Sequence, residues 1–386
     1  MLRRIAALGL GALLCADPAI SPACSLCTSL ATVPTLREDA AAAKLIIFGT
    51  LSNPRINAAA PGSSPDGSAT DLTVEQVLKT DPFLAGRKLL TLPRYVPLDP
   101  KNPPRFLVFC DVASGKLDPI RGCPASPALV EYLAGAMSLK AGDPSKQFVY
   151  FGRFLDHPDP EVSGDAFREF ARATDAEVTQ AAKLLDPGKL RKLLTDPKTP
   201  PERLSLIAYF LGSCGTAADG DLLGRLARQD NCGRAYGGLL AGYIQLRPED
   251  GWQLLGKTLG NSKEAFDRRI AALSTLRFLY RTHPSARPRA VDTLAALVPQ
   301  GDLSDLAVED LRQWGEWSLT TNVLAQYGKK SHAAPMVRRA IVRYALCCPR
   351  PEAKQFVEQL RRTDRQLVQD VEESLEFEKV TPAPGR

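Results

Sequence analysis

The sequence predicts a fold in two parts, a small β-barrel followed by an α-helical solenoid. Residues 44–151 contain five β-rich runs split by Gly, Pro and Asp, and residues 156–377 contain apolar residues spaced three and four apart. In the second part, arginines that open predicted helices recur at separations of 31, 35 and 70 residues, the last being two units of 35. These are Arg203, Arg234, Arg269 and Arg339. A repeat of this length is typical of stacked helix pairs, which bury their apolar faces against their neighbours and expose long binding surfaces.

Length and composition agree with a folded protein of more than one domain. The chain has 386 residues, of which 44% are hydrophobic and 24% charged. At about 150 residues per domain, this length predicts two or three domains. The composition is that of an ordinary soluble protein, and it excludes disorder of the whole chain.

The first 23 residues have the three regions of an export signal in order. Arg3 and Arg4 are followed by an apolar stretch, residues 5–16, and by a small-residue cleavage site at 21–23. The apolar stretch is too short to span a bilayer. We expect a cleaved signal at 1–23 and a periplasmic, cell-envelope or secreted protein, with an uncleaved anchor or a buried helix as the alternatives. No other segment is apolar for long enough to predict a membrane span.

The charge of the predicted mature chain does not point to nucleic acid. Cleavage removes two arginines and one aspartate, which leaves 47 basic and 42 acidic residues, a net charge of +5. This excess is too small for a nucleic-acid-binding surface. The local basic runs at 189–192 and 329–330 are interpreted as solvated helix ends and turns.

Four cysteines are candidates for disulfides in the first part. Eight of the nine cysteines remain after cleavage, an even number that suits an oxidising compartment. Cys24 and Cys27 begin the mature chain, and Cys110 and Cys123 flank a predicted loop, 111–122. We expect two bridges from the N-terminus to this loop, by either connectivity. The alternative, a four-cysteine metal site, fits less well because the spacings do not form two matched knuckles.

The other four cysteines are less easily paired, and we expect no bridge between Cys214 and Cys232. Cys214 and Cys232 lie at opposite ends of a predicted helix of about a dozen residues, about 18 Å apart. A disulfide needs Cα atoms within about 7 Å. Cys347 and Cys348 end a helix before Pro349 and are interpreted as buried thiols, with a vicinal bridge as the alternative.

The predicted elements of the first part follow one another closely. A helix over 128–139 is expected to cap or plug the barrel, and Gly- and Pro-rich loops over 61–68 and 93–104 join its strands. The five predicted strands cover 44–51, 71–78, 88–92, 106–109 and 147–151.

This first part resembles the netrin-like, OB-barrel module of tissue inhibitors of metalloproteinases. The resemblance covers residues 24–155 and depends on Cys24-x-x-Cys27 directly after the leader, a helix at 36–43 and the strands ending at Lys79 and Phe109. In that family a Cys-x-Cys start chelates the zinc of a protease through its amine and carbonyl, whereas this chain has one residue more between the cysteines. The resemblance implies an OB-like five-stranded barrel and, as an alternative function, an inhibitor or regulator of an extracellular hydrolase acting through the N-terminal rim.

The second part resembles HEAT and armadillo-type repeats. Residues 155–167, 268–279 and 337–345 each combine a Pro-Asp turn or an arginine start with one apolar stripe, although Asp305 stands where an arginine is expected. The resemblance implies about six helical pairs over 156–378, followed by a disordered tail at 379–386. The whole arrangement resembles exported bacterial proteins with HEAT repeats, a family that offers no activity to transfer.

No catalytic constellation emerges from the sequence. Residues 251–258 fit the phosphate-loop pattern G-x-x-x-x-G-K-T, but 248–261 predict a helix with its own start and stop, so the match is interpreted as accidental. His157, His283 and His332 lie in predicted turns. A carboxylate-based glycosidase stays open, since the mature chain has 42 acidic residues. We expect no enzyme, no cofactor and no metal site.

Two tryptophans are the candidates for partner binding. Trp314 and Trp317 fall at helical spacings, and core packing is the favoured interpretation. If an aromatic residue is exposed on the concave face, the Gly315 break makes one of these two the candidate. The sequence therefore predicts a non-catalytic exported scaffold that binds a protein or peptide partner. It identifies neither the partner nor the oligomeric state.

Overall fold

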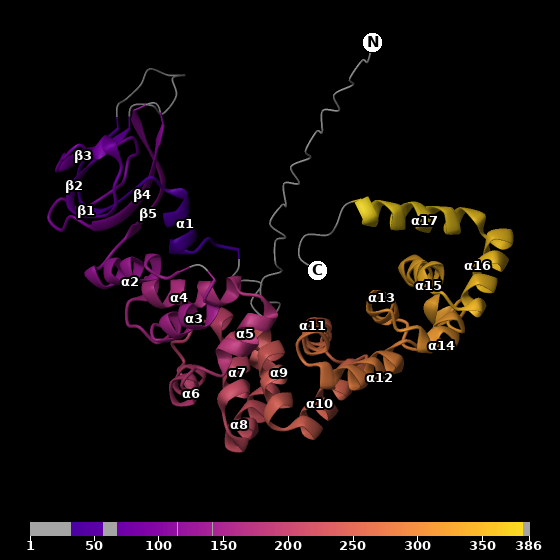
Figure 1. Ribbon diagram of the computed structural model, residues 1–386. Coiled ribbons are helices and arrows are strands. Elements are labelled where there is room, and N and C mark those ends of the chain that lie inside the picture. The colour runs from indigo at the N-terminus through magenta and orange to yellow at the C-terminus, as the bar shows by residue number, and fades with distance from the viewer. Residues whose placement is uncertain (1–31, 57–67, 114, 141, 381–386) are drawn as a thin grey trace, which may run out of the picture.

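The computed structural model describes residues 32–56, 68–113, 115–140 and 142–380, which form a small sheet followed by an arc of helices (Figure 1). The described residues contain five strands and 17 α-helices. The sheet lies at one end of the arc and the last helix at the other (Figure 1). In the described part, no helix is both long enough and apolar enough to cross a membrane.

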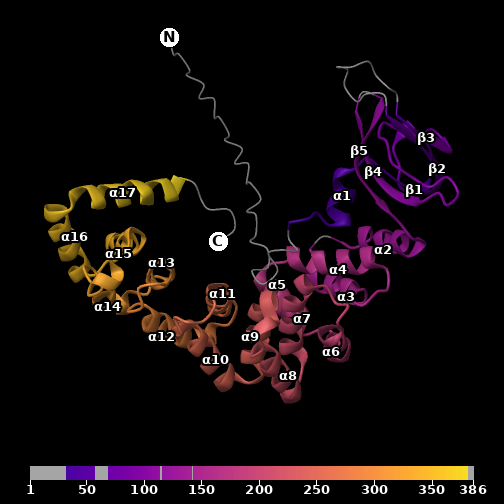
Figure 2. The same cartoon turned by 180° about the vertical axis from the view of Figure 1, so that it is seen from behind.

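The strands form one antiparallel sheet in the order β3-β2-β1-β4-β5. The sheet is curled (Figure 2), but β3 and β5 are its two edges and are not paired with each other. The predicted closed barrel is therefore corrected to an open sheet. The strands are β1 (Leu45–Arg55), β2 (Ala69–Lys79), β3 (Leu89–Leu92), β4 (Arg105–Ala113) and β5 (Lys116–Pro124).

The strand predicted at 147–151 is wrong, because these residues lie in helix α3 (Pro144–Gly152). The Asp143 side chain accepts a hydrogen bond from the Lys146 N–H, and Pro144 stands in the first turn, so a helix starts here. An apolar run this short does not distinguish a strand from a helix. The fifth strand is instead β5, which starts inside the predicted loop 111–122 and ends beyond it at Pro124. It pairs with β4 in a hairpin that contains Gly115 at φ 71°.

Alternate residues of the sheet enter two different cores, as the two-residue period of a strand requires. Ile46 and Phe48 belong to the main core, which includes α1 (Leu36–Ala42) and α2 (Pro127–Met137). Leu45 and Ile47 belong to a smaller core on the other face. Both helices match their predicted positions. Helices α2 and α3 share the main core with the arc.

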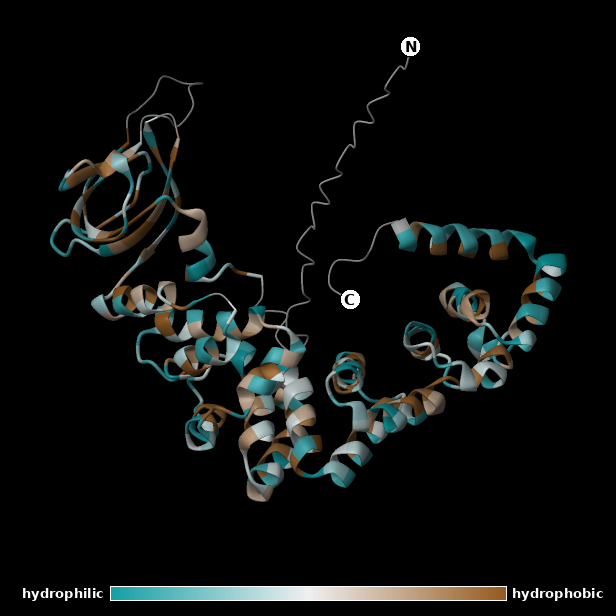
Figure 3. Cartoon of the chain, in the orientation of Figure 1, coloured by the Kyte–Doolittle hydropathy of each residue, from teal (hydrophilic) through white to brown (hydrophobic). Residues whose placement is uncertain are grey.

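Along the arc, α7, α9, α11, α13 and α15 lie on the inner side and α8, α10, α12, α14 and α16 on the outer side (Figure 1). Figure 3 shows hydrophobic and hydrophilic residues alternating along these helices, as one buried stripe per helix requires. The helices are α4 (Pro160–Arg172), α5 (Asp175–Ala182), α6 (Pro187–Thr195), α7 (Pro201–Cys214), α8 (Ala217–Ala227), α9 (Tyr236–Leu246), α10 (Pro248–Gly260), α11 (Phe266–Thr282), α12 (Arg287–Leu297), α13 (Ser304–Trp314), α14 (Thr320–Leu324), α15 (Pro335–Cys347), α16 (Pro351–Thr363) and α17 (Arg365–Val380).

The arginines from which the repeat was predicted lie near the starts of inner helices. Arg203, Arg269 and Arg339 lie in the first turns of α7, α11 and α15, and Arg234 lies in the 3₁₀ turn η2 (Asp230–Ala235) before α9. At the C-terminus, α17 continues to Val380, so the predicted tail at 379–386 begins inside a helix and its remainder lies outside the described residues.

Glycines bring α7 and α9 unusually close together. A Cβ atom on Gly238 would lie 1.7 Å from the Ser205 carbonyl oxygen, and one on Gly242 would lie 2.4 Å from the Ala208 oxygen. A Cβ on Gly212 would meet the Cα of Gly242 at 2.1 Å. Real Cβ atoms do not approach backbone atoms so closely, so this contact requires glycine at all three positions.

Candidate functional site

The N-terminal halves of α7, α9 and α11 border a hollow of about 940 Å³, which we call the α7–α9–α11 groove. Its floor contains small residues from the three helices, Ser205, Gly237, Ala271 and Ser274, and the larger apolar Ile270 of α11 also lines the hollow. Its rim is charged and comes from the starts of α7 and α11 and from the turns before α9 and α11. The rim residues are Glu202, Asp230, Arg234, Glu264, Asp267 and Arg268.

Hydrogen bonds hold the floor together across the helices. The Ser205 hydroxyl accepts a bond from the Gly238 N–H at 3.1 Å, and the Thr275 hydroxyl donates to the Gly237 carbonyl at 3.1 Å. Ser205 and Thr275 are buried. The three helices therefore present one fixed surface with few side-chain atoms above the backbone.

Helix α5 covers the C-terminal halves of α7 and α11 and so limits the groove to their N-terminal halves. The hydroxyls of Thr179 on α5 and Tyr209 on α7 lie 2.6 Å apart. Arg281 on α11 pairs with Asp175 on α5 at 2.9 Å. The rings of Tyr209 and Phe278 meet edge to face at a centroid distance of 4.9 Å. The contacts of α5 therefore lie on the C-terminal halves of α7 and α11, and the groove lies on their N-terminal halves.

The rim of the groove is negative overall. Its four carboxylates and two guanidinium groups give a formal net charge of −2, whereas the whole chain has +6. Glu202, Asp230 and Asp267 are exposed, and none has a hydrogen bond or ion pair with another described residue. Arg234 is exposed as well.

The Arg268 side chain at this rim is held by contacts within the chain. Its guanidinium lies 4.4 Å from the centroid of the Tyr236 ring and donates to the carbonyls of Ala227 and Gln229. Its Nε lies 3.6 Å from the Glu264 carboxylate. Arg268 and Glu264 thus partly neutralise each other, and the carboxylates without a partner dominate the charge of the groove.

The groove has one sulfur group, the half-buried thiol of Cys232. Burial raises the pKa of this thiol, so it remains protonated at neutral pH and is a poor nucleophile. As predicted, Cys214 and Cys232 lie at the two ends of α8, and both are free.

The three histidines lie at three separate helix connections, as expected. The His157 ring accepts a hydrogen bond from the Asp159 N–H, and His332 is buried with its Nε2 2.9 Å from the Val298 carbonyl. His283 follows α11, and burial lowers its pKa. The described residues contain no group of three or more side chains that could hold a metal ion.

The residues of the phosphate-loop pattern form a helix, as predicted. Residues 251–258 lie inside α10, and Asn261 is its C-cap. Gly256 is exposed, and a Cβ atom there would meet nothing within 4 Å. Backbone amides inside a helix are hydrogen-bonded to the preceding turn, so they cannot wrap a phosphate.

Trp314 and Trp317 are half-buried and pack against tyrosines. The Trp314 ring stacks on Tyr280 at a centroid distance of 3.6 Å with an interplanar angle of 4°. The Trp317 ring meets Tyr344 edge-on at 5.0 Å. Both contacts join neighbouring inner elements of the arc, which favours the packing role over an exposed binding strip.

The cysteines of the sheet lie on its opposite faces. Cys110 belongs to the smaller core and Cys123 to the main core, and both are free in the structure. Burial raises the pKa of Cys110 to about 12 and that of Cys123 to about 11. Cys24 and Cys27 lie outside the described residues, so the proposed bridges remain a prediction. At the end of α15, Cys348 is buried but Cys347 is exposed, and both are free.

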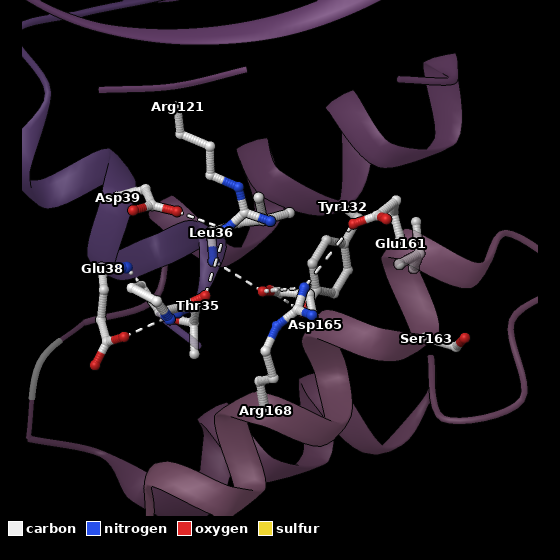
Figure 4. A network of polar contacts seen from close by, with 12 residues as sticks. Thr35, Leu36, Glu38, Asp39, Arg121, Tyr132, Glu161, Ser163, Asp165 and Arg168 are labelled. Carbon is white, nitrogen blue, oxygen red and sulfur yellow. Dashed lines mark hydrogen bonds and ion pairs between the residues drawn. The ribbon is translucent and has the colours of Figure 1, made fainter. Parts of the chain in front are cut away.

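A buried polar network joins the sheet and α1 to the arc (Figure 4). Asp165 on α4 accepts hydrogen bonds from the Leu36 N–H at 2.8 Å and from the Tyr132 hydroxyl at 2.9 Å. Arg121 on β5 pairs with Asp39 on α1 at 2.6 Å. Burial raises the pKa of Asp165. Since these groups bond to one another across α1, α2, α4 and β5, we interpret the network as a structural junction.

Comparisons with protein-family models, with curated proteins and with solved structures find no match. The functional proposal therefore depends on the geometry of the groove. Sequence reasoning missed this site because its floor is made of Ser, Gly and Ala, which give neither an apolar stripe nor a chemical motif. The one available clue was the cluster of small residues in the predicted inner helices, such as Gly237-Gly238.

Proposed function

We propose that this chain is a non-catalytic, exported scaffold whose helical repeats bind a protein or peptide partner. In this proposal the helices from α4 to α17 are a HEAT-like solenoid, and the open sheet is an OB-like module at one end of it. Export follows from the signal pattern of residues 1–23, which lie outside the described residues.

The observation that carries the proposal is the α7–α9–α11 groove. It lies on the side of the helices that α5 also covers, so a bound segment would extend the packing that α5 begins. The floor is backbone and small side chains, which allows the main chain of a partner to approach closely. Hollows between the helices of a repeat array are a usual binding surface in such proteins.

The test is selection of random nonapeptides, displayed on phage, against the full chain and against Ala271→Trp. A tryptophan on the groove floor fills the hollow, whereas Ala296→Trp on the exposed side of α12 is the matched control. Circular dichroism establishes that both variants fold, and Ser274→Tyr replaces Ala271→Trp if that variant does not.

The proposal predicts peptides that bind the wild type and Ala296→Trp but not Ala271→Trp. If every enriched peptide binds all three proteins equally, the groove is not the binding site. The alternative function, inhibition of an extracellular hydrolase, depends on Cys24, which lies outside the described residues.

A further inference from the structure

We propose that the α7–α9–α11 groove selects an extended peptide segment in which lysines and arginines outnumber acidic residues. This inference rests on the proposed function and deepens it by naming the chemistry of the partner. It depends on the cavity, on the small residues of its floor and on the charges around it.

The first step is the position of the unpaired carboxylates. Glu202, Asp230 and Asp267 come from α7, η2 and α11, and all three border the same hollow. Each is exposed and has no hydrogen bond or ion pair with another described residue. Three cationic side chains along one segment could each meet a carboxylate from a different helical element.

The second step is the contrast with carboxylates elsewhere in the arc. Asp219 pairs with Arg191 at 2.6 Å, and Asp310 pairs with Arg277 at 2.8 Å. Asp302 pairs with the buried Arg269. Neighbouring helices thus neutralise these three carboxylates. Other exposed carboxylates of the arc, such as Asp250 and Asp292, also lack an ion pair in the described chain, but around the groove three such carboxylates from three different elements border one hollow. Opposite charge on a partner complements this surface and speeds its encounter.

The third step is the shape of the hollow. Its volume of about 940 Å³ lies at the upper end of the range of small-ligand pockets, about 300–1,000 Å³. The lining offers Ser205, Gly237 and Ser274, and Ile270 is its one large apolar side chain. A segment of several residues with its backbone against this floor fits better than a bulky apolar ligand.

Arg234 sets a limit on the composition of the segment. It is exposed at the same rim and reduces the net charge of the groove to −2. An acidic residue or a terminal carboxylate beside Arg234 is therefore compatible with binding. Cations must still outnumber anions in the segment as a whole.

The test uses the nonapeptides from the selection above, resynthesised with a fluorescein label, and the full chain. The groove variant is Glu202→Gln/Asp230→Asn/Asp267→Asn. The matched control, Glu131→Gln/Asp292→Asn/Glu358→Gln, removes three exposed carboxylates that lie outside the groove. Fluorescence anisotropy measures the dissociation constant of each peptide.

The peptides that Ala271→Trp excludes are expected to carry excess lysine and arginine and to bind the groove variant about tenfold more weakly, since each exposed pair contributes modestly. The control variant should keep the wild-type affinity. Neutral or acidic groove-dependent peptides, or an equal affinity for the groove variant, would overturn this inference and leave the proposed function standing. If no peptide depends on Ala271, the proposed function itself fails.

Discussion

Two contacts between successive inner helices differ in the size of the residues that form them. Helices α7 and α9 meet through Gly212, Gly238 and Gly242, where the two backbones are in contact. Helices α11 and α13 meet through long side chains, with Arg277 paired to Asp310 at 2.8 Å and Tyr280 stacked on Trp314 at 3.6 Å. Large side chains therefore lie between α11 and α13, whereas the surface beside the α7–α9 contact is lined by the small residues Ser205 and Gly237. The groove lies beside this close contact.

The largest effect is expected at the glycine contact. Gly238→Ala would place a Cβ atom against the Ser205 carbonyl, and neither backbone can move without shifting its helix. We expect a loss of about 3 kcal/mol in the free energy of unfolding. Urea unfolding followed by circular dichroism measures it.

The matched control is Gly256→Ala in α10, where the added Cβ meets nothing within 4 Å. Alanine favours a helix over glycine, so this variant should gain up to about 1 kcal/mol. Equal stabilities of the two variants would contradict the close packing of α7 and α9. A gain at Gly256 also contradicts a phosphate loop at 251–258, in which this glycine would be required.

Two buried aspartates of the arc, Asp219 and Asp310, differ in the direction of their pKa shift. The Arg191 hydrogen bond lowers the pKa of Asp219 to about 2, and Asp219 also bonds the N-terminus of α8. At Asp310, burial outweighs the Arg277 pair and raises the pKa. We expect Asp219→Asn to cost about 1.5 kcal/mol at pH 7, allowing for the partial exposure of Arg191. Asp310→Asn should cost less than Asp219→Asn, since burial already disfavours the charged form of Asp310.

The stability difference between wild type and variant depends on pH in opposite directions for Asp219→Asn and Asp310→Asn. A lowered pKa means that Asp219 stabilises the fold above its unfolded pKa, near 4, and that this stabilisation disappears as the pH falls toward 2. The difference between wild type and Asp219→Asn should therefore shrink on acidification. For Asp310, whose pKa is raised, acidification should favour the wild type. Urea unfolding from pH 7 to pH 3 measures both, and parallel curves would contradict the assignment.

The smallest effect is expected at the aromatic contact. Tyr280→Leu removes the stack on Trp314 while keeping a comparable apolar side chain. We expect a loss of about 1 kcal/mol in the free energy of unfolding. The affinity of groove-dependent peptides should not change, because neither ring lines the groove. A loss of peptide binding with Tyr280→Leu would place the binding surface at α11 and α13 instead.

The arginines from which a repeat was predicted do not share one environment, since Arg234 is exposed whereas Arg269 has a clear physical role. Arg269 is buried, donates two hydrogen bonds to the Leu259 carbonyl and pairs with Asp302. Such a position tolerates few other side chains, so it is visible in the sequence. Strands β1 and β4 were predictable because their alternate residues enter two cores, and β3 because its alternate residues enter the smaller core.

Other features depend on tertiary contacts that one sequence does not show. Strand β5 contains Pro119 and Gly122 and has little β-propensity, but its pairing with β4 determines its conformation. The same applies to the groove. Its floor combines Ser205 with Ala271 and Ser274, which are far apart in the chain and have no chemical signature.

Hydrogen–deuterium exchange of the full chain, with and without a groove-dependent nonapeptide, tests the central claim most directly. The account predicts protection of amides in residues 230–238 and 264–274, at the turns and helix starts that border the groove. Protection centred on Trp314 and Trp317, or on the edges of the sheet, with no change at the groove, would contradict it.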